Sequence, residues 1–247
     1  MTPELIGIGV GPGHPDLLTI AAVRELAAAG RVFVPVMEPG VSGRAETVVR
    51  AHLTHDRVER LVFALNDDLT GSQRRRHDCW DAAAARVVAH LREHAGSAAF
   101  ATIGDPSVYS TFTYLAQTVR ELLPGVQIRT IPGITAMQAA ASAAGLTLVE
   151  GSEPLTLLPL SRDLAVMEDA LDVALRAGGT VVAYKAASRL AQLRERLAAA
   201  GALDRAWCAE HLGTPDERIT PLAQTHTAAY LSTVVVLPVR NGRGAQL

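Results

Sequence analysis

The amino-acid sequence predicts an α/β fold of two α/β domains, the first with a mostly parallel sheet and the second with a mixed sheet. In the first half, short and nearly continuous apolar runs alternate with longer segments of helical pattern, which is typical of parallel strands joined by crossover helices. In the second half, the last strands follow one another closely, which favours antiparallel pairing. Because Pro132 and Gly133 interrupt the chain, we expect domains at residues 1–131 and 132–247.

The first half contains five apolar runs that are typical of buried strands. The first run leads into Gly11-Pro12-Gly13, and the Leu- and Ala-rich helix after it ends at Gly30, a common C-cap residue. The third helix ends at Gly96 and the fourth strand ends at Gly104. The expected strands are residues 5–9, 32–35, 58–63, 98–103 and 126–130. The expected helices are residues 16–29, 44–53, 72–94 and 109–122.

The second half opens with a helix of small residues at 135–144 and continues with apolar and β-branched runs. Two helices, 164–177 and 188–200, separate the first three strands of this half. The last strands have no helical segment between them, so a mixed sheet is expected. The expected strands are residues 155–158, 180–184, 206–209, 218–220 and 233–237.

The overall composition indicates a soluble, cytoplasmic protein. A formal net charge of −2 and a pI of about 6.4 argue against a nucleic-acid partner and a polybasic membrane anchor. Two cysteines are too few for a disulfide scaffold or a four-cysteine zinc site. The chain starts without the basic segment of a signal peptide, and no apolar run reaches the ~18 residues of a membrane span.

The glycine-rich loop after the first strand does not fit a dinucleotide-binding fingerprint. The third glycine of that pattern would fall at Pro12 or His14, and Pro12 lacks the N–H that a pyrophosphate requires. The acidic residue expected about 20 residues further on is also missing, because the second strand ends at Pro35. The loops at 11–13 and 104–106 nevertheless both end strands, which predicts a ligand cleft of open identity at the carboxyl ends of the sheet.

Other catalytic patterns are weak. Residues 90–94 match H-x-x-E-H, but they end a helix, where polar residues are commonly solvated, so no metal site is expected. His52 is expected at the surface, and the chain has neither a G-x-S-x-G elbow nor a P-loop. The run Arg74–Arg76 is either a solvated helix start or a contact for a polyanionic substrate. Lys185 ends a strand and is either structural or part of a cleft.

Three motifs carry a family resemblance. With residues 9–19 (GVGPGHPDLLT), 104–110 (GDPSVYS) and 131–137 (IPGITAM), the chain resembles the tetrapyrrole methyltransferase family, the class III S-adenosylmethionine (SAM) methyltransferases of corrin and siroheme synthesis. The similarity extends over essentially the whole chain and includes a looser motif at 210–217; His14 replaces the usual aspartate of the first motif. Within the family, the second motif most resembles that of the precorrin-2 C(20)-methyltransferases.

The resemblance implies a homodimer in which SAM binds in the cleft between the two α/β domains. Relatives commonly have methionine at the position of Lys185. Transferred position by position, the implied cofactor contacts are Pro12, Gly104, Asp105, Val108, Thr135, Ala136, Lys185 and Leu212.

The implied reaction is attack by the C(20) meso carbon of precorrin-2, or of its cobalt-loaded counterpart, on the sulfonium methyl of SAM. Asp105, Tyr109 and Tyr230 are the candidates for taking the C(20) proton or for orienting pyrrole nitrogens. Because the substrate carries eight carboxylates, arginines are expected around it. The expected substrate contacts are Arg44, Arg74, Arg75, Arg76, Ser107, Ser110 and Arg162.

Three alternatives remain open at this point. The substrate can belong to another member, such as a uroporphyrinogen-III or precorrin-4 methyltransferase or the protein-modifying diphthine synthase. The chain can be a tetrapyrrole- or nucleoside-binding protein without catalysis, which would bind SAM without turnover. An NAD-dependent oxidoreductase is disfavoured by Pro12 and by the missing acidic residue.

Overall fold

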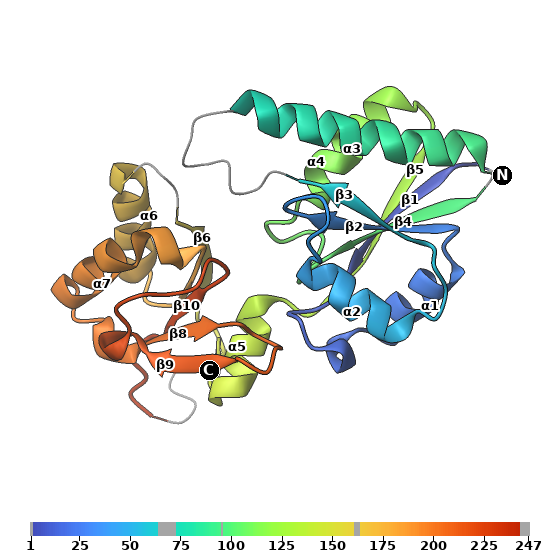
Figure 1. The fold of residues 1–247 in the computed structure, drawn as a ribbon. Helices are drawn as coiled ribbons and strands as arrows, with labels where there is room; N and C mark the ends of the chain where they lie inside the picture. Colours follow the sequence, from blue (N-terminus) through green and yellow to red (C-terminus); the bar gives the residue numbers. More distant parts are fainter. Residues whose placement is uncertain (1, 64–72, 95, 161–163, 243–247) are drawn as a thin grey trace. The chain divides into compact units, whose positions relative to one another are not determined.

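The computed structural model describes residues 2–63, 73–94, 96–160 and 164–242, and in the helix that starts at residue 73 it describes side chains from Arg76 onward. The chain forms two compact units, Met1–Thr135 and Ala136–Leu247, each built on one five-stranded sheet (Figure 1). The predicted class of two α/β sheets is therefore confirmed. Within these described ranges, no helix is long and apolar enough to cross a membrane.

The sheet of the first unit is wholly parallel, with the strand order β3-β2-β4-β1-β5. Helices α1 and α2 cover one face, and α3 and α4 cover the other (Figure 1). The strands are β1 Glu4–Gly9, β2 Arg31–Val36, β3 Val58–Val62, β4 Ser97–Thr102 and β5 Gln127–Ile131. The helices are α1 Ile20–Ala28, α2 Arg44–His52, α3 Gln73–Glu93 and α4 Phe112–Leu122.

Alternating side chains of the strands fill a core on each face of this sheet. Leu5 packs in the cluster with α3 and α4, whereas the next residue, Ile6, packs in the cluster with α1 and α2. At Gly7 a Cβ would lie 2.5 Å from the ring of Phe112. Glycine there lets the first residue of α4 pack directly on the backbone of β1, which fixes where the helix begins.

The strand order creates a switch point between β1 and β4. From β1 the chain continues to β2 on one side, whereas from β4 it continues to β5 on the other side. The loops that leave the two neighbouring strands therefore diverge, and their carboxyl ends lie next to each other. In open α/β sheets, ligands bind in the crevice outside such a point.

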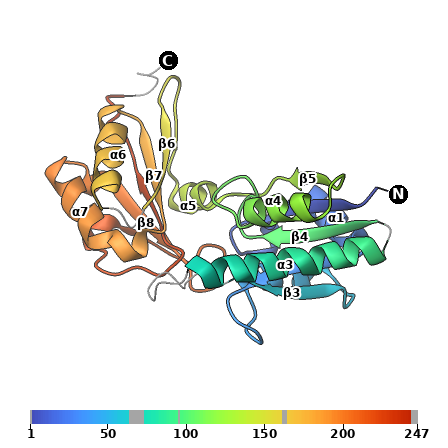
Figure 2. The same ribbon diagram turned by 90° about the horizontal axis from the view of Figure 1, so that it is seen from above.

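The sheet of the second unit is mixed, as predicted, with the order β6-β7-β10-β8-β9. Only β6 and β7 are parallel, and the other pairs are antiparallel. Helices α6 and α7 pack on one face and α5 on the other (Figure 2). The strands are β6 Leu155–Pro159, β7 Thr180–Tyr184, β8 Ala206–Glu210, β9 Arg218–Pro221 and β10 Thr233–Val236. The helices are α5 Ala136–Ala144, α6 Leu164–Arg176 and α7 Leu190–Ala199.

Three helices begin later than the sequence predicts, each for a local reason. Before α1, Pro15–Leu17 forms a 3₁₀ turn, and the Thr19 hydroxyl then caps the helix by accepting a hydrogen bond from the N–H of Ala22. Before α4, Tyr109 has a φ of 48°, which is incompatible with a helix. Before α7, Ala186–Arg189 forms another 3₁₀ turn.

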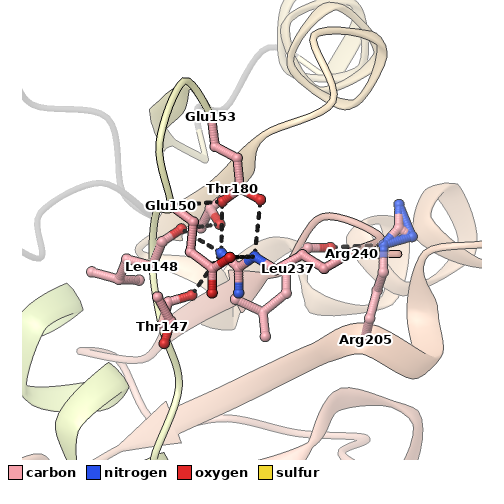
Figure 3. A network of polar contacts seen from close by, with 8 residues as sticks. All are labelled: Thr147, Leu148, Glu150, Glu153, Thr180, Arg205, Leu237 and Arg240. Atoms are coloured by element: carbon pink, nitrogen blue, oxygen red, sulfur yellow. Dashed lines mark hydrogen bonds and ion pairs between the residues drawn. The ribbon is translucent and has the colours of Figure 1, made fainter. Parts of the chain in front are cut away.

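A buried ion pair holds the segment before β6 in the second unit (Figure 3). Arg240 donates two hydrogen bonds to the Glu153 carboxylate, at 2.9 and 2.7 Å, and one to the carbonyl of Thr147 at 3.1 Å. The N–H of Glu150 also donates to Glu153, whose side chain is almost completely buried. The chain that follows β10 is thus fixed to the link between α5 and β6.

Replacing Arg240 with alanine should lower the Tm by roughly 5–10 °C, because removing one partner leaves a buried carboxylate unpaired. The hydrogen bonds from Arg240 hold the pKa of Glu153 below its ordinary 4.5. The stabilisation is therefore complete above pH 4.5 and disappears as the pH falls through the lower folded value. Thermal unfolding of the wild type and of Arg240→Ala at pH 7 and pH 3 checks this prediction. The difference between their Tm values should be smaller at pH 3, and an equal difference at the two pH values contradicts it.

Candidate active site

Three loops meet at the carboxyl ends of β1, β4 and β5, and glycine makes their contact possible. At Gly9, a Cβ would lie 2.6 Å from the carbonyl oxygen of Gly104 and 2.7 Å from the backbone of Gly133. At Gly133, a Cβ would overlap the same carbonyl oxygen and approach the Gly9 backbone to 2.8 Å. The three backbones touch because Gly9 and Gly133 have no side chains. We call this contact of Gly9, Gly104 and Gly133 the glycine junction.

A short backbone pairing extends the glycine junction toward the first motif. The N–H of Gly104 donates to the carbonyl of Gly11 at 2.7 Å, and the N–H of Gly11 donates back at 3.3 Å. Both glycines have a φ of +72°, which residues with side chains rarely adopt. The pairing places the predicted cofactor contact Gly104 beside the loop that contains Pro12, a buried residue.

Asp105 joins two of the loops. Its Oδ2 accepts a hydrogen bond from the N–H of Gly133 at 2.9 Å, and its Oδ1 accepts one from the N–H of Ser107 at 2.7 Å. Bonds from backbone N–H groups to a carboxylate are charge-assisted and strong. Both carboxylate oxygens therefore hold loop backbone, which gives Asp105 a positioning role at the glycine junction.

The turn between Asp105 and α4 is strained. Tyr109 has a φ of 48°, an outlier for a bulky residue, and such strain gathers at functional sites. Its side chain is 45% exposed, and partial burial raises the pKa of the phenol above its ordinary value. Of the predicted contacts nearby, Ser107 is exposed and Val108 is half-buried. Ser110 is buried, and its hydroxyl contacts that of Thr102 and accepts from the first N–H of α4.

The loop that contains Pro12 is held from α2. The Nε2 of His52 lies 2.9 Å from the carbonyl of Pro15, so this nitrogen carries the proton and donates it. His14 accepts a hydrogen bond from the N–H of Asp16 at 3.2 Å. The expectation that His52 is a surface residue is wrong, because its side chain is half-buried and anchors the first motif.

Half-buried arginines lie at the same edge of the first unit. A Cβ at Gly43 would come within 2.6 Å of the Pro35 carbonyl, so α2 begins tightly against the end of β2. Arg44 follows directly, and burial lowers the pKa of its guanidinium. Arg76 is half-buried near the start of α3. Arg74 and Arg75 lie in the first turn of α3 with side chains outside the described part, and Arg162 lies outside the described residues.

The remaining predicted residues divide between the units. Thr135 is buried at the end of the first unit, and Ala136 is the first residue of α5. Lys185 follows β7 with an exposed side chain and a left-handed φ of 59°. Leu212 follows β8 and is buried in the cluster beneath α5. Tyr230 is 48% exposed in the loop before β10.

Glu210, the first residue of the looser motif, was not predicted as a site residue, although it holds the loop of Tyr230. The Glu210 carboxylate is 1% exposed and accepts hydrogen bonds from Arg218 at 2.6 Å and from the N–H of Ala229 at 2.7 Å. Sequence reasoning also missed Gly9 and Gly133 as site residues, although both lie within the quoted motifs. Their position in the sequence could have revealed them: both follow strands of one parallel sheet, and the carboxyl ends of such strands always lie at the same edge.

In the H-x-x-E-H stretch, Arg92, Glu93 and His94 are exposed, as expected for a helix end, whereas the first histidine is not. His90 is buried, edge-on to Phe33 with ring centroids 6.0 Å apart, and is stacked on His94 at 4.7 Å. Burial lowers the pKa of His90, and the neighbouring His94 adds to the effect. In the part of the chain described by the structure, no three His, Cys, Asp or Glu residues are arranged to hold a metal ion.

The chain as a whole is similar to known proteins. The sequence profile of the Tetrapyrrole (Corrin/Porphyrin) Methylases matches residues 4–225. The precorrin-2 C(20)-methyltransferase of Sinorhizobium sp is 34% identical over 248 residues, 94% of each chain. A probable cobalt-precorrin-2 C(20)-methyltransferase of Methanocaldococcus jannaschii is 34% identical over 172 residues, 70% of each chain.

A solved structure has the same fold. Uroporphyrin-III C-methyl transferase from Thermus thermophilus, complexed with S-adenyl homocysteine, superposes with a TM-score of 0.62 at 20% identity, covering 94% of this chain and 96% of that one. The family profile spans most of the sequence, and the Sinorhizobium relative aligns along 94% of both chains. We conclude that this chain belongs to the tetrapyrrole (corrin/porphyrin) methylase family.

Proposed function

We propose that the protein is a SAM-dependent methyltransferase of cobalamin (vitamin B12) biosynthesis. It methylates the C(20) meso carbon of precorrin-2 to give precorrin-3A, or that of cobalt-factor II to give cobalt-factor III. The observation that carries the proposal is the glycine junction, which gathers three motif loops at the switch point of the first sheet. Both relatives described above are named for methylation at C(20) of precorrin-2 or cobalt-precorrin-2.

The loops that meet at the glycine junction suit SAM better than a dinucleotide. Pro12 has no N–H, and the N–H of Gly133 is already bound by Asp105, so few amide donors are left for a pyrophosphate. SAM has no phosphate, and it supplies a methyl group on a sulfonium that leaves as S-adenosylhomocysteine. The proposed contacts are Pro12, Gly104, Asp105, Val108 and Thr135 in the first unit, and Ala136, Lys185 and Leu212 in the second.

The protein contributes alignment and exclusion of water, because the methyl donor already carries a good leaving group. Asp105 acts as a positioning residue, since both its oxygens are occupied by backbone N–H groups. The Tyr109 phenol is protonated at neutral pH, and partial burial raises its pKa further above the ordinary value, so it can donate a hydrogen bond to the macrocycle. Tyr230, with its half-exposed side chain, is proposed to take the C(20) proton or to orient the pyrroles.

Arginines recognise the carboxylates of the tetrapyrrole in this proposal. Arg44 is the strongest candidate, because its half-buried guanidinium begins α2 tightly against the end of β2, and guanidinium groups bind carboxylates through two parallel hydrogen bonds. The remaining proposed substrate contacts are Arg74, Arg75, Arg76, Ser107, Ser110 and Arg162.

We also propose a cytoplasmic homodimer without nucleic-acid or membrane partners, with functional domains at residues 1–131 and 132–247. Both cysteines are free thiols, and the Cys208 thiol is buried with a pKa raised to about 12, which suits a reducing compartment. Size-exclusion chromatography with light scattering tests the dimer.

A methyl-transfer assay tests the function. SAM is offered with metal-free precorrin-2 and with cobalt-factor II in parallel, under strict anaerobiosis. Mass spectrometry counts the methyl groups added, and NMR locates them. One methyl group at C(20) supports the proposal, and the preferred substrate identifies the pathway. SAM binding without transfer to either compound overturns the substrate assignment and favours another member of the family.

Replacing Arg44 with glutamine should raise KM for the tetrapyrrole about tenfold and leave the affinity for S-adenosylhomocysteine unchanged. The matched control is Arg50→Gln in the last turn of the same helix, where the arginine donates a 2.7 Å bond to Glu46. Steady-state kinetics and calorimetry provide the two readouts. An unchanged KM in Arg44→Gln, or an equal rise in the control, removes Arg44 from the substrate site.

A further inference from the structure

Helix α3 is longer than the strands on which it packs, and its first turns extend past the carboxyl edge of the sheet. The helix has 21 residues, about 31 Å, whereas β4 has six residues, about 20 Å. It leads from β3 back to the start of β4, so its first turns lie at the carboxyl edge of the sheet, where the proposed site is (Figure 1). Among the described side chains, the fully buried contacts of α3 with the core begin only at Ala83.

Trp80 anchors this part of the helix through an aromatic stack. Its ring lies parallel to that of Tyr114 in α4, with an interplanar angle of 3° and ring centroids 4.4 Å apart. His77, one turn earlier in α3, is stacked on Trp80 at 5.5 Å. Tyr114 lies in the first turn of α4, directly after the strained turn at Tyr109. The stack therefore links the overhanging part of α3 to the loop of the second motif, and α3 and α4 lie side by side (Figure 2).

Trp80 contributes to this contact through the area of its aromatic stack and not through a hydrogen bond. In the described part of the chain, the shielded Nε1 of Trp80 has no acceptor. A parallel aromatic pair contributes beyond its buried area, and it fixes the relative orientation of the two helices. Arg76 lies one helical turn before Trp80, so its position relative to the second motif depends on this contact.

We propose that Trp80 is a positioning residue for substrate binding: stacked on Tyr114, it fixes the first turns of α3 and thereby sets where Arg76 meets the carboxylates of the tetrapyrrole. This inference rests on the proposed function for its substrate. The proposed role concerns binding of the tetrapyrrole and not of SAM. The glycine junction, where SAM is proposed to bind, is held by Asp105 and by glycine contacts that do not involve α3.

The test compares Trp80→Ala, Tyr114→Leu and Trp80→Phe with the control Leu91→Ala. Leu91 is buried in the same helix at its opposite end, so the control loses stability without affecting the stack. Trp80→Ala and Tyr114→Leu should raise KM for the tetrapyrrole about tenfold, with kcat within about twofold and the S-adenosylhomocysteine affinity unchanged. Trp80→Phe keeps an aromatic stack and should restore a KM near that of the wild type.

Hydrogen exchange provides a readout independent of activity. Amides of residues 76–82 should exchange faster in Trp80→Ala than in the wild type, and they should not do so in Leu91→Ala. A wild-type KM in Trp80→Ala, an equal KM rise in Leu91→Ala, or unchanged exchange at residues 76–82 overturns the inference. If the wild type methylates no tetrapyrrole, the proposed function fails, and the exchange result alone decides whether the stack anchors the helix.

Discussion

Replacing Gly133 with alanine is expected to lower the affinity for SAM by more than about 100-fold, a loss of roughly 3 kcal/mol of binding free energy, because the loops proposed to bind it could no longer meet. The new Cβ would overlap the carbonyl oxygen of Gly104 and lie 2.8 Å from the Gly9 backbone. Both obstacles are backbone atoms, so no side chain can turn away to make room. The loops after β1, β4 and β5 would have to separate, and they hold all the contacts proposed for SAM in the first unit.

The control for this variant is Gly125→Ala. Gly125 precedes the same strand, β5, at its opposite end, and a Cβ there would meet nothing within 4 Å. Its φ of +92° makes alanine unfavourable by roughly 1 kcal/mol, so the control loses some stability without touching the glycine junction. Calorimetry with S-adenosylhomocysteine and thermal unfolding separate the two effects. Wild-type affinity in Gly133→Ala would show that the glycine junction is not part of the cofactor site.

The elements of this fold were predictable because each has a local signal. Continuous apolar runs mark strands buried on both faces, and all five strands of the first sheet lie within one residue of their predicted ends. Helix starts were less predictable. The 3₁₀ turn before α1 and the left-handed Tyr109 before α4 depend on hydrogen bonds and packing that no periodicity reveals.

The motif loops of the candidate site could be named from the sequence, but their contact with one another could not. Spacing does not determine that β1 lies between β4 and β5, and only this order brings Gly9, Gly104 and Gly133 into contact. For the same reason, the pairing of Trp80 with Tyr114 and the anchoring of Pro15 by His52 have no sequence signature, because each joins segments more than 30 residues apart. Such contacts follow from the topology and not from local preference.

Replacing Asp105 with alanine should weaken S-adenosylhomocysteine binding roughly 10- to 100-fold, because two charge-assisted hydrogen bonds that order the loops disappear. The carboxylate accepts from the N–H groups of Ser107 and Gly133, at 2.7 and 2.9 Å. Without the carboxylate, the loops after β4 and β5 become ordered only when SAM binds. The entropy cost of ordering them then lowers the affinity for SAM. At saturating SAM the loops are ordered again, so kcat should recover to within about tenfold of the wild type.

The asparagine variant distinguishes positioning from proton transfer at Asp105. Asparagine offers one acceptor oxygen, and its NH₂ group would face the other backbone N–H, so a positioning role predicts that Asp105→Asn binds S-adenosylhomocysteine nearly as weakly as Asp105→Ala. If Asp105 took the C(20) proton, the same variant would lose kcat while binding the cofactor normally. Glu4→Gln is the matched control, because it removes a carboxylate that accepts a 2.7 Å bond from Arg129 at the amino end of β1. A loss of affinity in Glu4→Gln as large as that in Asp105→Asn would mean that general destabilisation, and not the contact between Asp105 and Gly133, governs SAM binding.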